Sequence, residues 1–222
     1  MKPKLILASR SPRRRELLEN AGYEIEVMPP DESVEEGPFE ALAPEELVAE
    51  LAQLKAENVL LALRGEQQTG DPVEKFLLRR TPTAIEPIDD TRVVLGGDTV
   101  AEREGKVLGK PVDRDDARRM LGMLSGRRHY VWSGLCLWPM NEEMPLVAVE
   151  RTILFMDPLS EEQIETYLDS NAWVGKAGAF GYQDGLDWIR ILEGPESNVV
   201  GLPMELLEKM LTALGKKGGE GM

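Results

Sequence analysis

Residues 5–22, which decide the fold, have the sequence LILASRSPRRRELLENAG. The run begins with four apolar residues, Leu5–Ala8, which predict a short buried strand. Ser11 then suits the N-cap of a helix, Pro12 suits its first position, and Gly22 suits the left-handed position after its last turn. A strand that leads directly into a capped helix is typical of an α/β protein.

The rest of the chain extends this pattern in both strand and helix periods, without an internal repeat. Residues 65–90 are rich in Gly, Pro, Thr, Gln and charge, and they predict a surface insertion. Residues 215–222 predict a flexible tail. We therefore expect a single α/β domain over residues 1–214. Further strands are expected at 23–28, 92–96, 130–138, 146–156 and 186–192, and helices at 44–64, 113–124, 160–169 and 203–214.

Composition excludes several classes of function. The chain has 222 residues and a net charge of −14, so it is not expected to bind nucleic acid or an anionic membrane surface. Cys136 and His129 are the sole residues of their types, which excludes an internal disulfide, a cysteine zinc site and a histidine cluster. We expect Cys136 to be an inert buried thiol and His129 to be a packed or capped histidine.

The sequence also argues against a membrane protein. The longest stretch without charge, which contains residues 129–140 and ends at Asn141, is too short to span a bilayer. The N-terminal residues lack the long apolar segment of a signal peptide. The expected protein is soluble and intracellular.

The first candidate binding residues are Ser9, Arg13 and Arg14, at the junction of the first strand and helix. Free N–H groups and a partial positive charge at a helix N-terminus favour a bound anion. Arginines in a first turn are unfavourable for an isolated helix, and a phosphate placed there would resolve the conflict. The alternative is a solvated basic turn whose charge is offset by Glu16 and Glu19.

The second candidate is Asp98, which follows Gly96 and Gly97 directly after an apolar strand. Ligands of open α/β sheets bind near the carboxyl ends of the strands, and paired glycines permit a close approach of backbone to ligand. Asp98 is suited to hold Mg²⁺ or to deprotonate a water. The alternative is an Asx-turn at the end of the strand.

Further candidates are Lys110, Lys176 and Gln183. Residues 108–111 (LGKP) do not match a P-loop, because Pro111 stands where Ser or Thr should bind metal. Lys110 and Lys176 remain suitable for phosphate, and Gln183 offers both a donor and an acceptor to a nucleotide base. Taken alone, each is more typical of an ordinary surface residue.

Three ordered blocks together resemble the Maf family of nucleoside triphosphate pyrophosphatases. They are residues 7–14 (LASRSPRR), residues 97–99 (GDT) with 108–111 (LGKP) and 124–127 (LSGR), and residues 176–183 (KAGAFGYQ) with 197–203 (SNVVGLP). The resemblance covers nearly all of the chain outside residues 65–90 and the tail. It implies a fold like that of inosine triphosphate pyrophosphatase, with an elongated mixed β-sheet flanked by helices and two lobes around a central cleft.

The resemblance also implies an activity. Members of the family hydrolyse the α–β phosphoanhydride of a nucleoside triphosphate, releasing a monophosphate and pyrophosphate, and so cleanse the nucleotide pool. A divalent cation (Mg²⁺ or Mn²⁺), a cytoplasmic location and a homodimer are implied as well. By motif position, Asp98 would be the proton acceptor and, with Glu32, would hold the metal. The residues implied to hold phosphates are Ser9, Arg13, Arg14, Lys55, Lys110 and Lys176.

Base selectivity depends on the branch of the family. The branch that acts on dTTP and UTP carries the residue types found here at Arg13, Thr99 and Gln183, whereas the 7-methyl-GTP branch differs. Arg10, Gly97, Tyr182 and Asp184 depart from the usual pattern, and these departures bear on selectivity more than on chemistry. The alternatives are a 7-methyl-GTP or broad-specificity enzyme, and a nucleotide-binding regulator of cell division without significant turnover.

Overall fold

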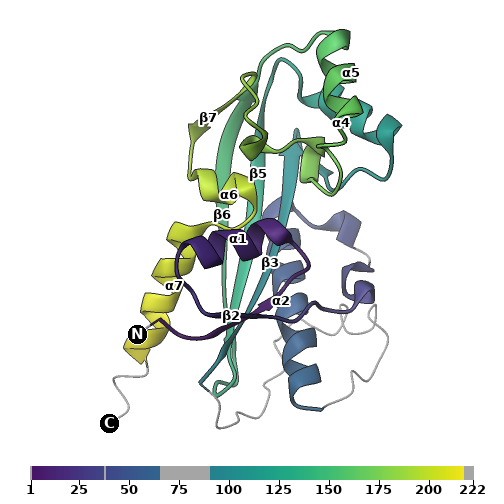
Figure 1. Cartoon of the computed structure of the whole chain (residues 1–222). Coiled ribbons are helices and arrows are strands. Elements are labelled where there is room, and N and C mark those ends of the chain that lie inside the picture. Colours follow the sequence, from purple (N-terminus) through teal and green to yellow (C-terminus); the bar gives the residue numbers. More distant parts are fainter. Residues whose placement is uncertain (1, 38, 66–90, 218–222) are drawn as a thin grey trace. The chain divides into compact units, whose positions relative to one another are not determined.

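The computed structural model describes residues 2–37, 39–65 and 91–217. The insertion predicted at 65–90 lies outside the described residues except for Gly65, and the predicted tail lies outside them from residue 218. Figure 1 shows the chain with its helices and strands labelled. The strands are β1 (Leu5–Ala8), β2 (Ile25–Val27), β3 (Val93–Arg103), β4 (Lys106–Leu108), β5 (Arg127–Pro139), β6 (Leu146–Met156) and β7 (Ile189–Glu193). The α-helices are α1 (Pro12–Asn20), α2 (Pro44–Leu63), α4 (Arg114–Leu124), α5 (Glu161–Asp169), α6 (Glu196–Val200) and α7 (Met204–Lys217), and the 3₁₀ turns are η1 (Glu32–Glu35), η2 (Phe39–Ala41), η3 (Ala177–Ala179) and η4 (Tyr182–Asp184).

The described strands form one seven-stranded mixed sheet. Its order is β2-β1-β3-β5-β6-β7, and β4 pairs with β3 outside this path. Strand β1 is parallel to both β2 and β3, whereas the pairs β3–β4 and β6–β7 are antiparallel. The prediction of an α/β fold with a mixed sheet is therefore confirmed.

The chain divides into two compact units. Unit 1 comprises Met1–Asp98, Gly134–Val149 and Met204–Met222, and unit 2 comprises Thr99–Ser133 and Glu150–Pro203. Strands β3, β5 and β6 each contribute residues to both units.

In unit 1, helix α2 packs closely on strands β1, β3 and β5. In Figure 1, α1 lies in front of β3 and α2 lies behind it. A Cβ at Gly96 would overlap the carbonyl oxygen of Ala52, and a Cβ at Gly134 would overlap that of Val48. Because Gly96 and Gly134 have no side chain, the backbone of α2 packs directly on β3 and β5, at two points that are one helical turn apart. The buried core on this face consists of Ile6, Ala8, Ala52, Ala56, Val59, Leu60, Val94, Cys136, Trp138 and Met140.

This packing assigns different roles to the two consecutive glycines of β3. We expect Gly96→Ala to lower the free energy of unfolding by about 2 kcal/mol, because the new methyl group meets helix backbone that cannot rotate away. A Cβ at Gly97 would meet its nearest atoms at 3.6 Å, an ordinary contact. Gly97→Ala should therefore change stability by less than about 1 kcal/mol. Urea denaturation of both variants measures the difference, and an equal loss at the two positions would contradict this account.

In unit 2, helices α4 and α5 pack together over the strands. Their apolar residues share one core with Trp173 and Phe180 of the Gly-rich segment. Ser160 caps α5, accepting a hydrogen bond from the Gln163 N–H at 3.2 Å, while the Gln163 side chain accepts from the Ser160 N–H at 2.9 Å. These two hydrogen bonds form a complete capping box. The core residues include Ala101, Leu121, Leu124, Leu154, Met156, Ile164 and Leu168.

His129 is fully buried in unit 2, as expected for a packed histidine. Its ring stacks edge-on against Phe180, with ring centroids 5.4 Å apart. Burial lowers the pKa of His129 to about 4, an effect that the nearby Arg127 carbonyl opposes and Arg103 reinforces. Among the described residues, its Nε2 atom has no hydrogen-bond partner.

The buried imidazole makes stability depend on pH. The folded protein keeps His129 neutral down to about pH 4, whereas the unfolded chain takes up the proton below about pH 6.5. Stability is thus complete above pH 6.5 and is lost as the pH falls toward 4. We expect this residue to lower the free energy of unfolding by about 2 kcal/mol between pH 7.5 and pH 5. Denaturant titrations of wild type and His129→Gln at both pH values isolate that contribution, and identical pH dependence in the two proteins would refute it.

Candidate active site

Asp98 lies within strand β3 and not at its end. The strand was expected to stop near the glycines, but it continues unbroken to Arg103. Its parallel partner β1 ends at Ala8, which is paired with Gly96, and β4 then pairs with β3 from Ala101 to Arg103. In register, Asp98 therefore lies two residues beyond the carboxyl end of β1, and it is the last residue of the first segment of unit 1.

The Asp98 carboxylate is held by a buried lysine. Lys55 on α2 donates from Nζ to Asp98 Oδ1 at 2.6 Å, and the same ammonium lies 2.7 Å from Glu35 Oε1. The Lys55 side chain is 6% exposed and that of Asp98 13%, whereas that of Glu35 is 51% exposed. Lys55 thus joins one buried and one accessible carboxylate. We call Ser9, Arg14, Glu35, Lys55 and Asp98 the Asp98 cluster.

Helix α2 also positions the acidic segment that carries Glu35. Asn58, one turn after Lys55, donates to Asp31 Oδ2 at 3.0 Å and accepts from the Asp31 backbone N–H at 3.1 Å. Val34 is buried beneath the η1 turn. This acidic segment is therefore a 3₁₀ turn held at its N-cap, Asp31, and at the buried Val34 side chain.

Arg14 joins the start of α1 to strand β3. Its Nη1 atom donates to Ser9 Oγ at 3.1 Å and to the Gly97 carbonyl at 2.7 Å. Burial lowers the pKa of Arg14, while the negative charge of Asp98 raises it. The guanidinium thus holds the backbone next to Asp98, and its positive charge interacts with the Asp98 carboxylate. Arg13, half-buried on the same turn, also acts electrostatically on Arg14.

Unit 1 therefore brings together four of the candidate residues, Ser9, Arg14, Lys55 and Asp98. Glu32 instead forms an exposed ion pair with Arg10, at 2.5 Å. Glu35 was not singled out from the sequence, because which glutamate of the run faces α2 depends on the phase of a four-residue turn. Val34 is the apolar residue of this turn, and its burial fixes which side of the turn faces inward.

The cluster offers carboxylate oxygens, which are the ligands that Mg²⁺ and Mn²⁺ prefer. The described residues contain no group of three or more His, Cys, Asp or Glu side chains that could hold a metal ion. Mg²⁺ commonly binds to proteins through one or two carboxylates and completes its shell with water and substrate phosphates. Asp98 and Glu35 both contact the Lys55 ammonium, so their carboxylates lie near the same point. Two carboxylates placed in this way fit a metal ion that binds together with a phosphate.

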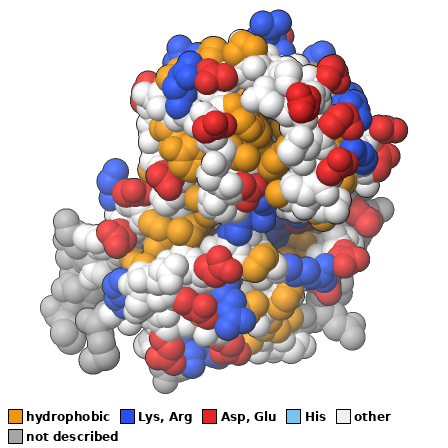
Figure 2. Space-filling view, turned by 45° about the horizontal axis from the view of Figure 1, so that its top comes forward, with side chains coloured by type: hydrophobic (Ala, Val, Ile, Leu, Met, Phe, Trp, Pro, Cys, Tyr) orange, Lys and Arg blue, Asp and Glu red, His pale blue; other side chains and the backbone are white. Residues whose placement is uncertain are grey.

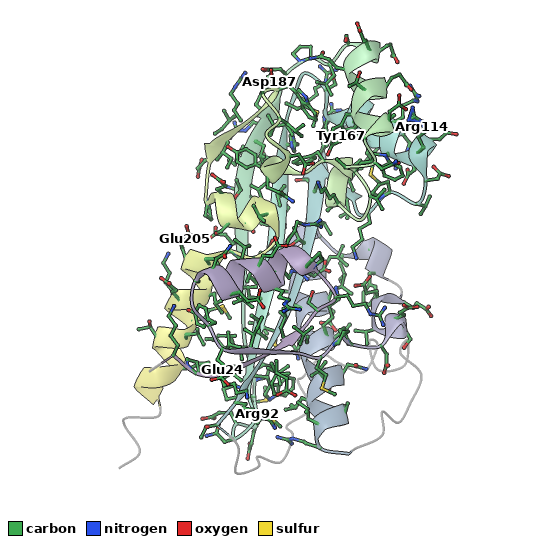
Figure 3. All side chains as sticks on the ribbon, viewed as in Figure 1. Glu24, Arg92, Arg114, Tyr167, Asp187 and Glu205 are labelled. Carbon is green, nitrogen blue, oxygen red and sulfur yellow. The ribbon has the colours of Figure 1, made fainter. Side chains whose placement is uncertain are left out.

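Unit 2 holds the second set of candidates. The Lys176 Nζ atom lies 2.5 Å from both oxygens of the Asp184 carboxylate. Tyr167, labelled on α5 in Figure 3, donates its hydroxyl to Asp184 Oδ2 at 2.8 Å. We call Tyr167, Lys176, Gly181 and Asp184 the Lys176 cluster. Lys110 and Gln183 belong to the same unit, and both are exposed.

Thr99, the first residue of unit 2, bonds to its own framework. Its Oγ1 atom lies 2.8 Å from Ser133 Oγ and donates to the Gly201 carbonyl at 3.3 Å. Ser133 Oγ in turn lies 3.4 Å from the carbonyl oxygen of Asn198. The hydroxyl of Thr99 is therefore oriented by the segment that carries the SNVVGLP motif, a role that sequence alone did not indicate.

The surrounding surface is mixed in charge. Figure 2 shows acidic and basic side chains interspersed over the visible face. The net charge of −14 means that cations for an anionic ligand must be gathered locally, as Arg14 and Lys55 are. No described helix is long and apolar enough to cross a membrane.

Comparison with known proteins gives consistent matches. The Maf-like protein family matches residues 4–214. A dTTP/UTP pyrophosphatase of Rhodopirellula baltica is 45% identical over 208 residues, which are 93% of this chain and 80% of that protein. A dTTP/UTP pyrophosphatase of Symbiobacterium thermophilum is 42% identical over 212 residues, 95% of this chain and 94% of that protein. Among solved structures, the Staphylococcus aureus Ham1 protein covers 96% of this chain, with 99% of its own length aligned, at a TM-score of 0.45 and 11% identity.

Proposed function

The chain belongs to the Maf-like protein family, and from that premise we propose that it is a nucleoside triphosphate pyrophosphatase with dTTP and UTP as preferred substrates. It hydrolyses the bond between the α- and β-phosphates and releases a nucleoside monophosphate and pyrophosphate. The names of the two relatives support the substrates, and the Asp98 cluster supports the chemistry.

The contact between Asp98 and Lys55 carries this proposal. The ammonium bonds Asp98 Oδ1 at 2.6 Å and so fixes the orientation of the carboxylate. In the proposed reaction Oδ2 accepts a proton from the attacking water. Attack by water requires no nucleophilic cysteine, serine or histidine, which agrees with the burial of Cys136 and His129.

The cationic residues hold the polyanionic substrate. Ser9, Arg13, Lys55, Lys110 and Lys176 are the proposed phosphate ligands. Arg14 belongs with them by its motif, and its bonds to Ser9 and Gly97 give it the added task of supporting the strand of Asp98. Fixed positive groups of this kind stabilise the charge that develops on a leaving phosphate.

Asp98 and Glu35 are the proposed metal-binding carboxylates, and Glu32 is the further one implied by the motif. A Mg²⁺ or Mn²⁺ ion bound with the substrate would neutralise charge on the leaving pyrophosphate. The accessible Glu35 can turn from Lys55 toward such an ion at little cost, because half of its side chain already meets solvent.

A nucleotide panel tests the proposed function. Purified protein is incubated with dTTP, UTP, 7-methyl-GTP and the remaining common triphosphates, with and without Mg²⁺ or Mn²⁺, and the products are separated. Monophosphate and pyrophosphate in equal amounts, formed fastest from dTTP and UTP, are expected. Release of orthophosphate and a diphosphate would contradict cleavage between the α- and β-phosphates. Nucleotide binding without turnover would instead support a regulatory protein.

Gln183 is the proposed determinant of base selectivity. Its amide can donate to a base carbonyl, whereas the carboxylate of Gln183→Glu can only accept. We expect this exposed substitution to lower kcat/KM for dTTP and UTP by about tenfold while sparing stability. The ratio of kcat/KM for UTP to that for 7-methyl-GTP is the readout. An unchanged ratio would remove Gln183 from base recognition.

The assembly and location follow from the same proposal. We expect a homodimer in the cytoplasm, where the nucleotide pool that the enzyme cleanses is found. Sedimentation at micromolar concentration measures the assembly state.

A further inference from the structure

The ammonium of Lys176 is paired with both oxygens of one carboxylate. Both oxygens of the Asp184 carboxylate lie 2.5 Å from Nζ, and the two side chains are 11% and 18% exposed. An ammonium has three N–H donors, so this arrangement commits most of its hydrogen-bonding capacity to one carboxylate.

A separate element holds Asp184 in this position. The Tyr167 hydroxyl, from α5, donates to Asp184 Oδ2 at 2.8 Å and accepts from the Gly181 backbone N–H at 3.2 Å. Tyr167 is itself buried and packs edge-on against Trp188, with ring centroids 5.5 Å apart. Asp184 is therefore held by Tyr167 as well as by Lys176, and the position of Asp184 in turn fixes that of the Lys176 ammonium.

The backbone is also shaped around the pair. A Cβ at Gly181 would overlap Nζ and Cε of Lys176 and Oδ2 of Asp184. The lysine thus lies directly against the chain at Gly181, where any side chain would displace it from Asp184.

These contacts have an electrostatic consequence. Lys176 is one of the proposed phosphate ligands, yet its charge is cancelled by a carboxylate that the triphosphate must face. We propose that Asp184 is a positioning residue that restrains Lys176 and weakens the binding of triphosphate and pyrophosphate, so that the product is released. This inference rests on the proposed function for the class of ligand, and on the Lys176 cluster for the mechanism.

Asp184→Asn removes the charge and keeps an oxygen that can accept from Tyr167. A change of one nearby charge is worth about tenfold in affinity, so the dissociation constant for pyrophosphate should fall about tenfold, and KM should fall with it. Because release becomes slower, kcat should also fall. Asp184→Glu retains the charge and should keep affinity close to that of wild type.

The experiment measures pyrophosphate binding by calorimetry in these variants and in Lys176→Met, together with steady-state kinetics and thermal unfolding. Asp187→Asn, an exposed position labelled in Figure 3 on the loop before β7, is the matched control and should change nothing. Weaker or unaltered pyrophosphate binding in Asp184→Asn would overturn the inference. So would a Lys176→Met protein that binds pyrophosphate as wild type does.

The two proposals fail in different ways. If wild type hydrolyses triphosphates but Asp184→Asn binds pyrophosphate no more tightly, the restraint alone is refuted. If no triphosphate is hydrolysed, the proposed function is refuted, and the calorimetric comparison still decides the role of Asp184.

Discussion

Asp98→Asn is expected to lower kcat by about a thousandfold while leaving nucleotide binding within a fewfold of wild type. The amide preserves the shape of the side chain and can still accept a bond from Lys55, but it cannot take a proton from water. The loss should therefore appear in kcat and not in KM, because the missing interaction belongs to the transition state.

The measurement is pyrophosphate release under saturating dTTP, with nucleotide affinity determined separately by calorimetry. Asp115→Asn, the same change at an exposed position in the first turn of α4, controls for the loss of one negative charge. A turnover number within tenfold of wild type would exclude Asp98 as the proton acceptor. Loss of nucleotide binding in parallel with turnover would instead assign it to substrate recognition.

Lys55→Met is expected to have the second largest effect, a fall in kcat/KM of about a hundredfold. The substitution keeps an unbranched side chain as far as Cε and removes the ammonium that contacts Asp98 at 2.6 Å and Glu35 at 2.7 Å. Two carboxylates then remain near each other without their cation, so Asp98 loses its orientation and the phosphates lose a ligand. Breaking such a pair also destabilises the fold.

Kinetics at several Mg²⁺ concentrations, with unfolding curves for the same preparations, check this result. The matched control is Lys209→Met, at an exposed position on α7. Wild-type kcat/KM in a folded Lys55→Met protein would refute the role of the ammonium. Lower stability with normal kinetics would show that Lys55 serves the fold alone.

The sequence predicted best the helices whose ends are set by capping residues within or next to the helix. Ser11, Pro12 and Gly22 bound α1, and Ser160 begins α5, because caps act over three or four residues of chain. The end of β3 was wrong, since a strand ends where its partners end. Here β1 stops opposite Gly96 and β4 pairs from Ala101, while β5 is the other neighbour of β3 in the sheet, so β3 continues past the glycines.

The structure brings several of the candidate site residues together, and their roles stay predictions. The motif residues Ser9, Arg14 and Asp98 do meet in unit 1, and Lys55 meets Asp98 across 43 positions of sequence. Glu35 and Asp184 were not predicted as partners of these lysines. The rotation of a short 3₁₀ turn decides which of its acidic side chains faces a given lysine. A turn of three or four residues is too short to show a hydrophobic periodicity from which that rotation could be predicted.

The two glycines beneath α2 have a consequence for how the chain can vary in length. Lys55 and Asn58 follow Ala52, whose carbonyl rests on Gly96, by less than two helical turns. One residue added between Ala52 and Lys55 would rotate the ammonium by about 100° around the helix axis and disconnect it from Asp98. Residues added after Leu63 would leave this short register unchanged. Insertions and deletions should therefore accumulate among homologues downstream of α2 and be absent from its middle.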